Sequence, residues 1–259
     1  MNTKILPEKA LSVIDQYMNF SFGRATCSVP YFNNKTVGAR MALRVNIGKG
    51  SPKEIYEEVQ ALIVKNHIDS GILDNDSLKR LMADNNIGVD CSAFTYYVLD
   101  AISRDSLHGG IDRHLSFVNC GGIFGKFKCS IRPVENCDVA TFTHDKNSHP
   151  INISDARCGD FISMVNDGDD SERDHIIIIH QIEYQNFIPI KIHYSHAIKY
   201  LEDGLYGSGI RQGTITIVNQ GAPLTEAIWE EDGKNKDTNL LFLRAKKSQT
   251  SLRRLNWFK

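Results

Sequence analysis

The stretch DHIIIIHQIEYQNFIPIKIHYSHA, residues 174–197, predicts two antiparallel β-strands joined by a tight turn. Its first half contains four consecutive isoleucines, which indicates a strand that is buried on both faces. Its second half alternates apolar and polar residues from Ile188 to Tyr194, which is the period of a strand. Gln185-Asn186 suits a two-residue turn between them, because asparagine tolerates the positive φ that such turns require.

The position of this turn determines which side chains face each other across the two strands. With the turn at Gln185-Asn186, Ile179 lies opposite Ile192. His175, at the start of the first strand, then lies opposite His196. Directly opposed residues have Cβ atoms about 4.5–5.5 Å apart, so a hydrogen bond between these two imidazoles can fix the tautomer of the first.

A shifted turn would bring a different histidine to this place. His193 would then face His175 instead of His196. We favour His196, because Lys191 indicates that the face carrying His193 points to solvent. His180 lies an odd number of positions from His175, so its side chain points to the opposite face of the strand. We interpret His180 and His193 as ordinary sheet histidines.

A second stretch, GVDCSAFTYYVLDAI at residues 88–102, places a cysteine at the start of a predicted helix. Asp90 is a good N-cap, and Cys91 would occupy the first helical position. The thiol would lie among unpaired backbone N–H groups at the positive end of the helix dipole, a location that favours the thiolate. The same N–H groups can stabilise an oxyanion. The alternative interpretation is a buried structural cysteine.

The rest of the chain predicts helices first and strands afterwards, an order that indicates an α+β fold. Ser51, Pro52 and Glu54 form a capping box at one helix start. Residues 105–157 are interpreted as an insertion of loops and short strands within a single domain, 1–259. The other expected elements are helices over 7–20, 51–68 and 75–84, and strands over 39–48, 159–165, 213–219 and 239–245.

The composition excludes several function classes. A length of 259 residues suits one domain, and a formal net charge of -1 argues against a nucleic-acid-binding protein. No apolar run approaches the roughly 18 residues of a membrane span. The opening residues, MNTKILPEKALSVIDQYM, lack the apolar core of a secretory signal peptide, so we expect a cytoplasmic location or export by a route other than Sec.

The sequence predicts neither a metal nor a cofactor. Its six cysteines include no Cys-x-x-Cys pair, and their spacing with the histidines is irregular for zinc. The acidic stretch DGDDSERD at 167–174 lacks the spacing and the final glutamate of a calcium loop. The segment IGKGS at 47–51 is too short for a phosphate-binding loop.

Several of these segments resemble sequence motifs of a known protein family. Residues 90–94, Asp-Cys-Ser-Ala-Phe, resemble the Asp-Cys-Ser-Gly-Phe nucleophile motif of the NlpC-type cell-wall peptidases. Residues 158–162 are similar to the Gly-Asp-Leu strand start that precedes the family's histidine, and residues 174–176 are similar to its Ser/Asp-His-Val segment. His196 matches the third polar residue, usually histidine, on the family's next strand.

The resemblance implies a compact papain-like fold, with N-terminal helices packed on a central antiparallel sheet. It also implies a cysteine peptidase that cleaves amide bonds in peptidoglycan stem peptides through a thioester, without a metal. Cys91 would attack, His175 would act as base and then acid, and His196 would orient it. The neighbouring polar residues are candidate substrate contacts: Asp90, Ser92 and Asp174. Two alternatives stay open, namely acyl transfer by the same residues and a catalytically silent module that binds a peptide or glycan.

Overall fold

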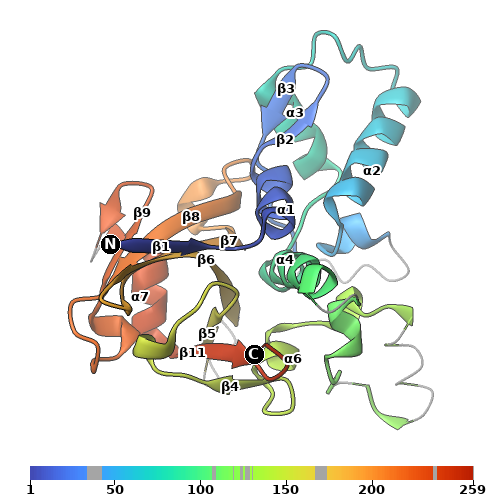
Figure 1. Ribbon diagram of the computed structural model, residues 1–259. Coiled ribbons are helices and arrows are strands. Elements are labelled where there is room, and N and C mark those ends of the chain that lie inside the picture. Colours follow the sequence, from blue (N-terminus) through green and yellow to red (C-terminus); the bar gives the residue numbers. More distant parts are fainter. Residues whose placement is uncertain are drawn as a thin grey trace.

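The computed structural model combines helices with an antiparallel sheet, which confirms the predicted α+β class (Figure 1). It describes residues 1–33, 43–106, 109–118, 120–122, 125, 129, 131–166, 174–235 and 238–258. No helix within these ranges is long and apolar enough to cross a membrane. The described helices are α1 (Glu8–Met18), α2 (Pro52–Lys65), α3 (Asn75–Asp84), α4 (Cys91–Ser106), α6 (Val139–Thr143) and α7 (Leu240–Lys247).

A nine-stranded sheet forms the centre of the molecule, and all of its described pairings are antiparallel. β1 (Asn2–Ile5) lies off the main path and pairs with the second half of β6. A separate hairpin consists of β2 (Phe20–Phe22) and β3 (Ala25–Cys27). The order along the main path is β10 (Lys234–Asn235), β9 (Ile228–Glu231), β8 (Gly209–Thr216), β7 (Ile188–Ile198), β6 (His175–Gln185), β5 (Phe161–Val165), β11 (Gln249–Leu255) and β4 (Ser148–Pro150).

Strand β6 is buried on both faces, as its four isoleucines predict. Ile176 and Ile178 belong to a core that includes residues of α1 and α4. Ile177 and Ile179 belong to a second core on the other face, beneath α7. All four side chains are fully buried. The sheet is therefore the middle layer between α1 and α4 on one side and α7 on the other (Figure 1).

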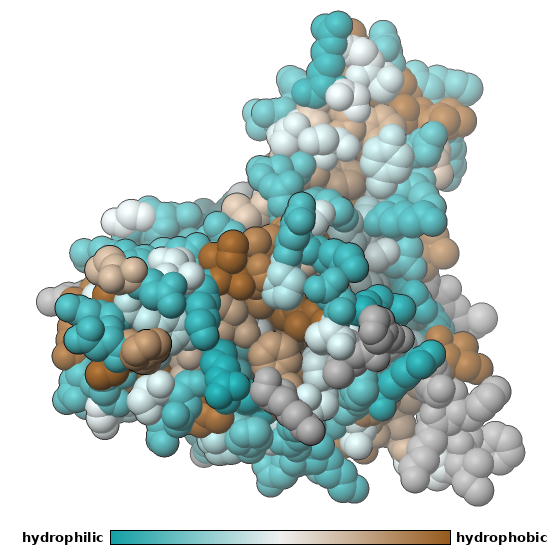
Figure 2. Space-filling model, in the orientation of Figure 1, coloured by the Kyte–Doolittle hydropathy of each residue, from teal (hydrophilic) through white to brown (hydrophobic). Residues whose placement is uncertain are grey.

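The predicted helices over 7–20, 51–68 and 75–84 are confirmed as α1, α2 and α3. The capping box at the start of α2 is present, with the Ser51 hydroxyl accepting from the Glu54 N–H. Figure 2 shows apolar side chains gathered in a hollow between the sheet and this helical part of the molecule.

Two predicted strands are wrong. Residues 44–47 form a 3-10 turn that ends at Gly48, whose φ of 75° is left-handed; residues 39–42 of that predicted strand lie outside the described part of the chain. Residues 239–245 form α7 rather than a strand. The Asn239 side chain accepts from the Phe242 N–H at 3.0 Å as an N-cap, and this capping signal outweighs the run of apolar residues.

The predicted hairpin of β6 and β7 exists, but its register is wrong by two residues. The turn falls at Asn186-Phe187, one position later than predicted, with φ of 51° and 65°. Two bulges follow, one in each strand, and Ile179 pairs with Tyr194 rather than with Ile192. Outside the stretch between the bulges the pairing is shifted by two residues, which keeps side chains there on their predicted faces. His196 therefore shares a face with His175 without lying directly opposite it.

Residues 105–157 contain more helical turn than expected. Among the described residues of this segment, β4 is the only strand, and it belongs to the main sheet. A disulfide joins Cys120 to Cys129, while Cys137 is free and buried. The described helical pieces are α6 and three single turns, η2 (Ile111–Arg113), η3 (Val134–Asn136) and η4 (Ile153–Asp155).

Candidate active site

Helix α4 begins at Cys91, as the capping argument predicts. The Asp90 carboxylate accepts from the Ala93 N–H at 2.7 Å, which is the contact expected of an N-cap. The preceding residue Val89 pairs with Tyr31 in an isolated bridge, so the entry to the helix is held by backbone contacts as well. Only 4% of Cys91 is exposed.

A buried lysine holds the turn that carries the cysteine. The Lys49 ammonium lies 2.9 Å from the Asp90 carboxylate and donates to the Ser92 hydroxyl at 2.7 Å and to the Cys137 carbonyl at 2.9 Å. Burial opposes the charge of Lys49, but the Asp90 carboxylate outweighs it and keeps the pKa of Lys49 above its ordinary value. Asp90 and Ser92, which the sequence offered as candidate substrate contacts, are both buried and both contact this ammonium.

We expect Lys49→Met to lower the free energy of unfolding by about 3–5 kcal/mol, because it leaves the Asp90 carboxylate buried without its cation. Urea unfolding followed by circular dichroism measures this change. Lys53→Met is the matched control, since the Lys53 side chain is 85% exposed and pairs with Glu57 across one helical turn. Equal stability of the two variants would contradict the prediction.

The Cys91 sulfur lies beside the first residues of β6. The pairing of β6 with β7 begins at the turn and ends at Ile178 and Ser195. Beyond that point the Ile176 N–H donates to the Cys91 sulfur. The sulfur is thus in contact with the residue that follows His175. Among the described contacts, no hydrogen bond joins the sulfur to the His175 ring.

His175 starts a chain of buried hydrogen bonds across three strands. Its Nε2 lies 2.8 Å from Nδ1 of His196, which is the imidazole contact that the sequence predicts. Nε2 of His196 lies 2.7 Å from the Glu231 carboxylate on β9. All three residues are at most 5% exposed. Sequence reasoning predicted the two histidines and missed the glutamate.

The Glu231 carboxylate is held by three donors. Besides His196, it accepts from the Tyr194 hydroxyl at 3.1 Å and from the Tyr200 hydroxyl at 2.6 Å. Burial alone would raise its pKa, but the electrostatic interaction with His196 and these hydrogen bonds outweigh burial and hold the pKa of Glu231 below its ordinary value. Glu231 is therefore ionised at neutral pH and acts only as an acceptor.

An ionised Glu231 determines where the hydrogens of both rings lie. It requires a donor at Nε2 of His196, so Nδ1 of a neutral His196 must accept. Nε2 of His175 then donates to that Nδ1, and Nδ1 of His175 retains its lone pair. The chain of contacts therefore leaves His175 with one nitrogen ready to accept a proton.

The expectation of a resting thiolate is wrong. Burial and then the Asp90 charge raise the pKa of Cys91 to about 11, despite the opposing effects of the Ile176 N–H, Lys49 and Arg244. Burial, and then the electrostatic interactions with Arg244 and His196, lower the pKa of His175 well below its ordinary value of 6.5. The resting site thus pairs a neutral thiol with a neutral imidazole, and activation of the thiol requires a base at the moment of attack.

We expect the free energy of unfolding to fall as the pH drops below about 6.5, the pKa of an unfolded histidine. Burial lowers the pKa of His175 well below this value and, together with His193, lowers that of His180 to about 4. The unfolded chain therefore binds protons that the folded chain resists. Urea unfolding at pH 7.5, 6 and 5 measures the effect, and His180→Gln should remove part of it. Constant stability over this range would contradict the prediction.

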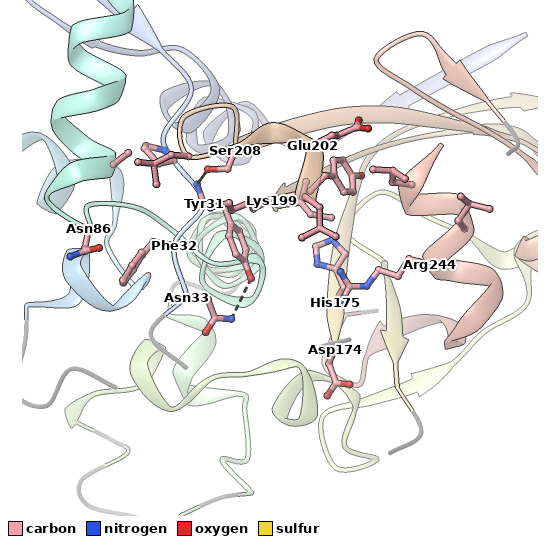
Figure 3. A pocket seen from close by; sticks show the side chains of 18 of the residues that line it. Tyr31, Phe32, Asn33, Asn86, Asp174, His175, Lys199, Glu202, Ser208 and Arg244 are labelled. Atoms are coloured by element: carbon pink, nitrogen blue, oxygen red, sulfur yellow. Dashed lines mark hydrogen bonds between the residues drawn. The ribbon is translucent and has the colours of Figure 1, made fainter. Parts of the chain in front are cut away.

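A cleft of about 930 Å³ opens in front of His175 (Figure 3). Asp174 also lines it, whereas Cys91 is not among the lining residues. Most of the wall is apolar and comes from segments far apart in the chain. The other lining residues are Pro30, Tyr31, Phe32, Asn33, Ala83, Asn86, Ile87, Ile198, Lys199, Tyr200, Leu201, Glu202, Leu205, Ser208, Leu240, Leu243, Arg244 and Lys247.

The sequence contains a signal that could have identified Glu231. Glu231 lies two residues after the buried Trp229 and on the same face of β9. Asp232-Gly233 then forms a two-residue turn with φ of 51° and 74°. An Asp-Gly pair after alternating residues is a strong hairpin signal. Arg244 of α7 escaped notice because its segment was interpreted as a strand.

Comparison with known proteins does not place the chain in a family. No protein-family model matches the chain, and no curated protein or solved structure matches it significantly.

Proposed function

We propose that this chain is a cysteine-dependent amide hydrolase with a papain-like arrangement of helices and sheet. Cys91 is the nucleophile and His175 the general base, while His196 and Glu231 orient His175. The proposal depends on one observation: the buried chain of hydrogen bonds that leads from Glu231 through His196 to His175 and leaves Nδ1 of His175 able to accept a proton.

The reaction would proceed in two halves. His175 takes the proton of Cys91 as the sulfur attacks the substrate carbonyl, and the backbone N–H of Cys91 donates to the resulting oxyanion. The tetrahedral intermediate then collapses, His175 returns its proton to the departing amine, and a thioester remains on Cys91. In the second half His175 takes a proton from water as the water attacks the thioester. The intermediate then collapses to the carboxylic acid, and His175 returns this proton to the departing Cys91 sulfur, which regenerates the thiol.

The charge of Glu231 supports this order of events. When His175 accepts the proton, the new positive charge is hydrogen-bonded through His196 to a carboxylate that is already ionised. Cys91 and His175 are both neutral at rest, so His175 becomes protonated only when the thiol attacks. A purely structural role for this chain is a weaker explanation, because buried polar groups cost stability that well-packed apolar side chains would not.

The substrate class follows from the resemblance to NlpC-type peptidases, and we propose peptide amides such as those of peptidoglycan stem peptides. A cleft of about 930 Å³ has room for several residues of a peptide. Acyl transfer to an acceptor other than water would use the same residues up to the thioester.

Digestion of purified peptidoglycan, followed by mass spectrometry of the fragments, tests the proposal. We expect pairs of fragments whose masses sum to the parent plus one water, which also locates the cleaved bond. Cys91→Ala should release none of them, while Cys158→Ala, a substitution of a free cysteine that is not a lining residue of the cleft, should release them at the normal rate. Fragments that persist with Cys91→Ala, or an intact wild-type digest, would refute the proposal.

A further inference from the structure

The connection between β7 and β8 places two leucines in the wall of the cleft. Leu201 is fully exposed and Leu205 is 55% exposed, and both line the cleft. Glu202 lies between them in the chain and forms an ion pair with Lys234 on β10. Large apolar side chains that are exposed together at a cleft commonly mark a binding surface.

This connection is fixed near its first leucine. The Tyr200 hydroxyl donates to the Glu231 carboxylate at 2.6 Å, and the Tyr200 N–H donates to the Asp203 carboxylate at 2.7 Å. Asp203 also forms an ion pair with Arg211, whose guanidinium carbon lies 4.9 Å from the centre of the Tyr200 ring. The turn that follows Tyr200 is therefore held in place while its leucine stays exposed.

The end of the connection is anchored as well. The Lys79 ammonium of α3 donates to the Ser208 carbonyl, and the Ser208 hydroxyl accepts from the Tyr31 N–H at 3.3 Å. The Gly207 N–H donates to the Asp203 carbonyl at 3.0 Å. Both leucines thus lie on a segment whose backbone is already ordered, so a ligand that covered them would have little further ordering to impose.

The helical side of the cleft is apolar too. Phe32 is half-buried and lines this side, while Lys199 and Glu202 mark the side of the β7–β8 connection (Figure 3). A side chain between these two walls would lie in the same cleft as His175. The other apolar residues that line the cleft from the helical side and from α7 are Pro30, Ala83, Ile87, Leu240 and Leu243.

We propose that Leu201 and Leu205 form a subsite for a large apolar side chain of the substrate peptide, near the amide that is cleaved. This inference rests on the proposed function and narrows its substrate class. Moving one leucine-sized side chain out of water favours binding by about 10- to 100-fold. Because both leucines are exposed, most of their apolar surface remains to be covered by such a side chain.

Binding to the Cys91→Ala protein tests the proposal without turnover. The probes are alanine tetrapeptides with both ends blocked, in which leucine replaces alanine at each position in turn; the matched probes carry serine there. We expect titration calorimetry to give an affinity about 10- to 100-fold higher for leucine than for serine at one position or more. Adding Leu201→Ser together with Leu205→Ser should reduce this preference to within about threefold and leave the affinity for the serine peptide unchanged.

Two further double variants complete the design. Leu201→Met with Leu205→Met keeps an apolar surface and should keep most of the preference. Val64→Ser with Ile72→Ser is the matched control, because it removes two exposed aliphatic side chains that do not line the cleft; it should keep the full preference. Equal affinity for leucine and serine peptides, or no measurable binding of any leucine peptide, would overturn the proposal. A preference that survives the loss of both leucines would overturn it too.

A second copy of the chain is the other occupant that exposed leucines could attract. Analytical ultracentrifugation should give the same monomer for the wild type and for Leu201→Ser with Leu205→Ser. A dimer that these two substitutions dissociate would assign the leucines to a contact between copies and would overturn the proposal.

The peptidoglycan digest separates this inference from the proposed function, because binding to the Cys91→Ala protein requires no chemistry. Fragments released from peptidoglycan, together with equal binding of the leucine and serine peptides, would leave the hydrolase standing and refute the apolar subsite. A leucine preference that depends on Leu201 and Leu205, with no fragments released, would support the subsite and refute the hydrolase.

Discussion

His175→Asn is expected to lower kcat by about 10⁴- to 10⁶-fold while KM changes little, because the loss of the base in such a site costs nearly the whole chemical step. Asparagine keeps a polar side chain on the same face of β6 but has no group that can take the thiol proton at neutral pH. Release of peptide fragments under saturating substrate measures the change.

The control for this variant lies on the same strand. His180→Asn removes an imidazole that contacts the Ser195 hydroxyl at 2.9 Å on the opposite face, away from the cleft. We expect its kcat to stay within about threefold of wild type, since it touches none of the proposed reacting groups. Similar losses in both variants would indicate damage to β6 and would count against His175 as the base.

Glu231→Gln is expected to lower kcat by about 10²- to 10⁴-fold, because the substitution changes the tautomers of both rings. The glutamine amide can donate to Nε2 of His196, which then carries its hydrogen on Nδ1 and donates to Nε2 of His175. His175 would hold its own hydrogen on Nδ1, on the side that should receive the thiol proton. The base would thus be blocked with almost no change in shape.

Glu230→Gln provides the matched control, since Glu230 is the exposed neighbour on the other face of β9. Its kcat should equal that of wild type. A fall in kcat for Glu231→Gln with unchanged thermal stability would support the tautomer argument. Normal turnover in Glu231→Gln would show that the carboxylate is structural only.

The sequence predicted the parts of the molecule that local rules govern. Ser51 begins α2 through its capping box, Asp90 begins α4, and the isoleucines of β6 are buried on both faces. Each of these features depends on side chains only a few positions apart. The hairpin register was missed because the turn falls one position later than Gln185-Asn186, which shifts the pairing by two residues and leaves no mark in a pattern of period two.

The site was predicted only where its residues come from such segments. The contact of His175 with His196 followed from one hairpin, although the register that produces it was different. Glu231 and Arg244 arrive from distant segments, and no local pattern links them to Cys91. The neutral state of the thiol could not be predicted either, because it results from burial by residues that converge only in the folded chain.

The opposed bulges of the central hairpin determine whether His175 and His196 of the proposed site lie on the same face of the sheet. One extra residue, His180, sits in β6 and another, Ile190, sits in β7, so their displacements cancel before the ends of the strands. Loss of either residue alone would turn one imidazole to the wrong side of the sheet, whereas loss of both would restore the alignment. In proteins related to this chain, the lengths of these two strands should therefore change together. An insertion or deletion in one strand alone should mark a protein that lacks the proposed activity.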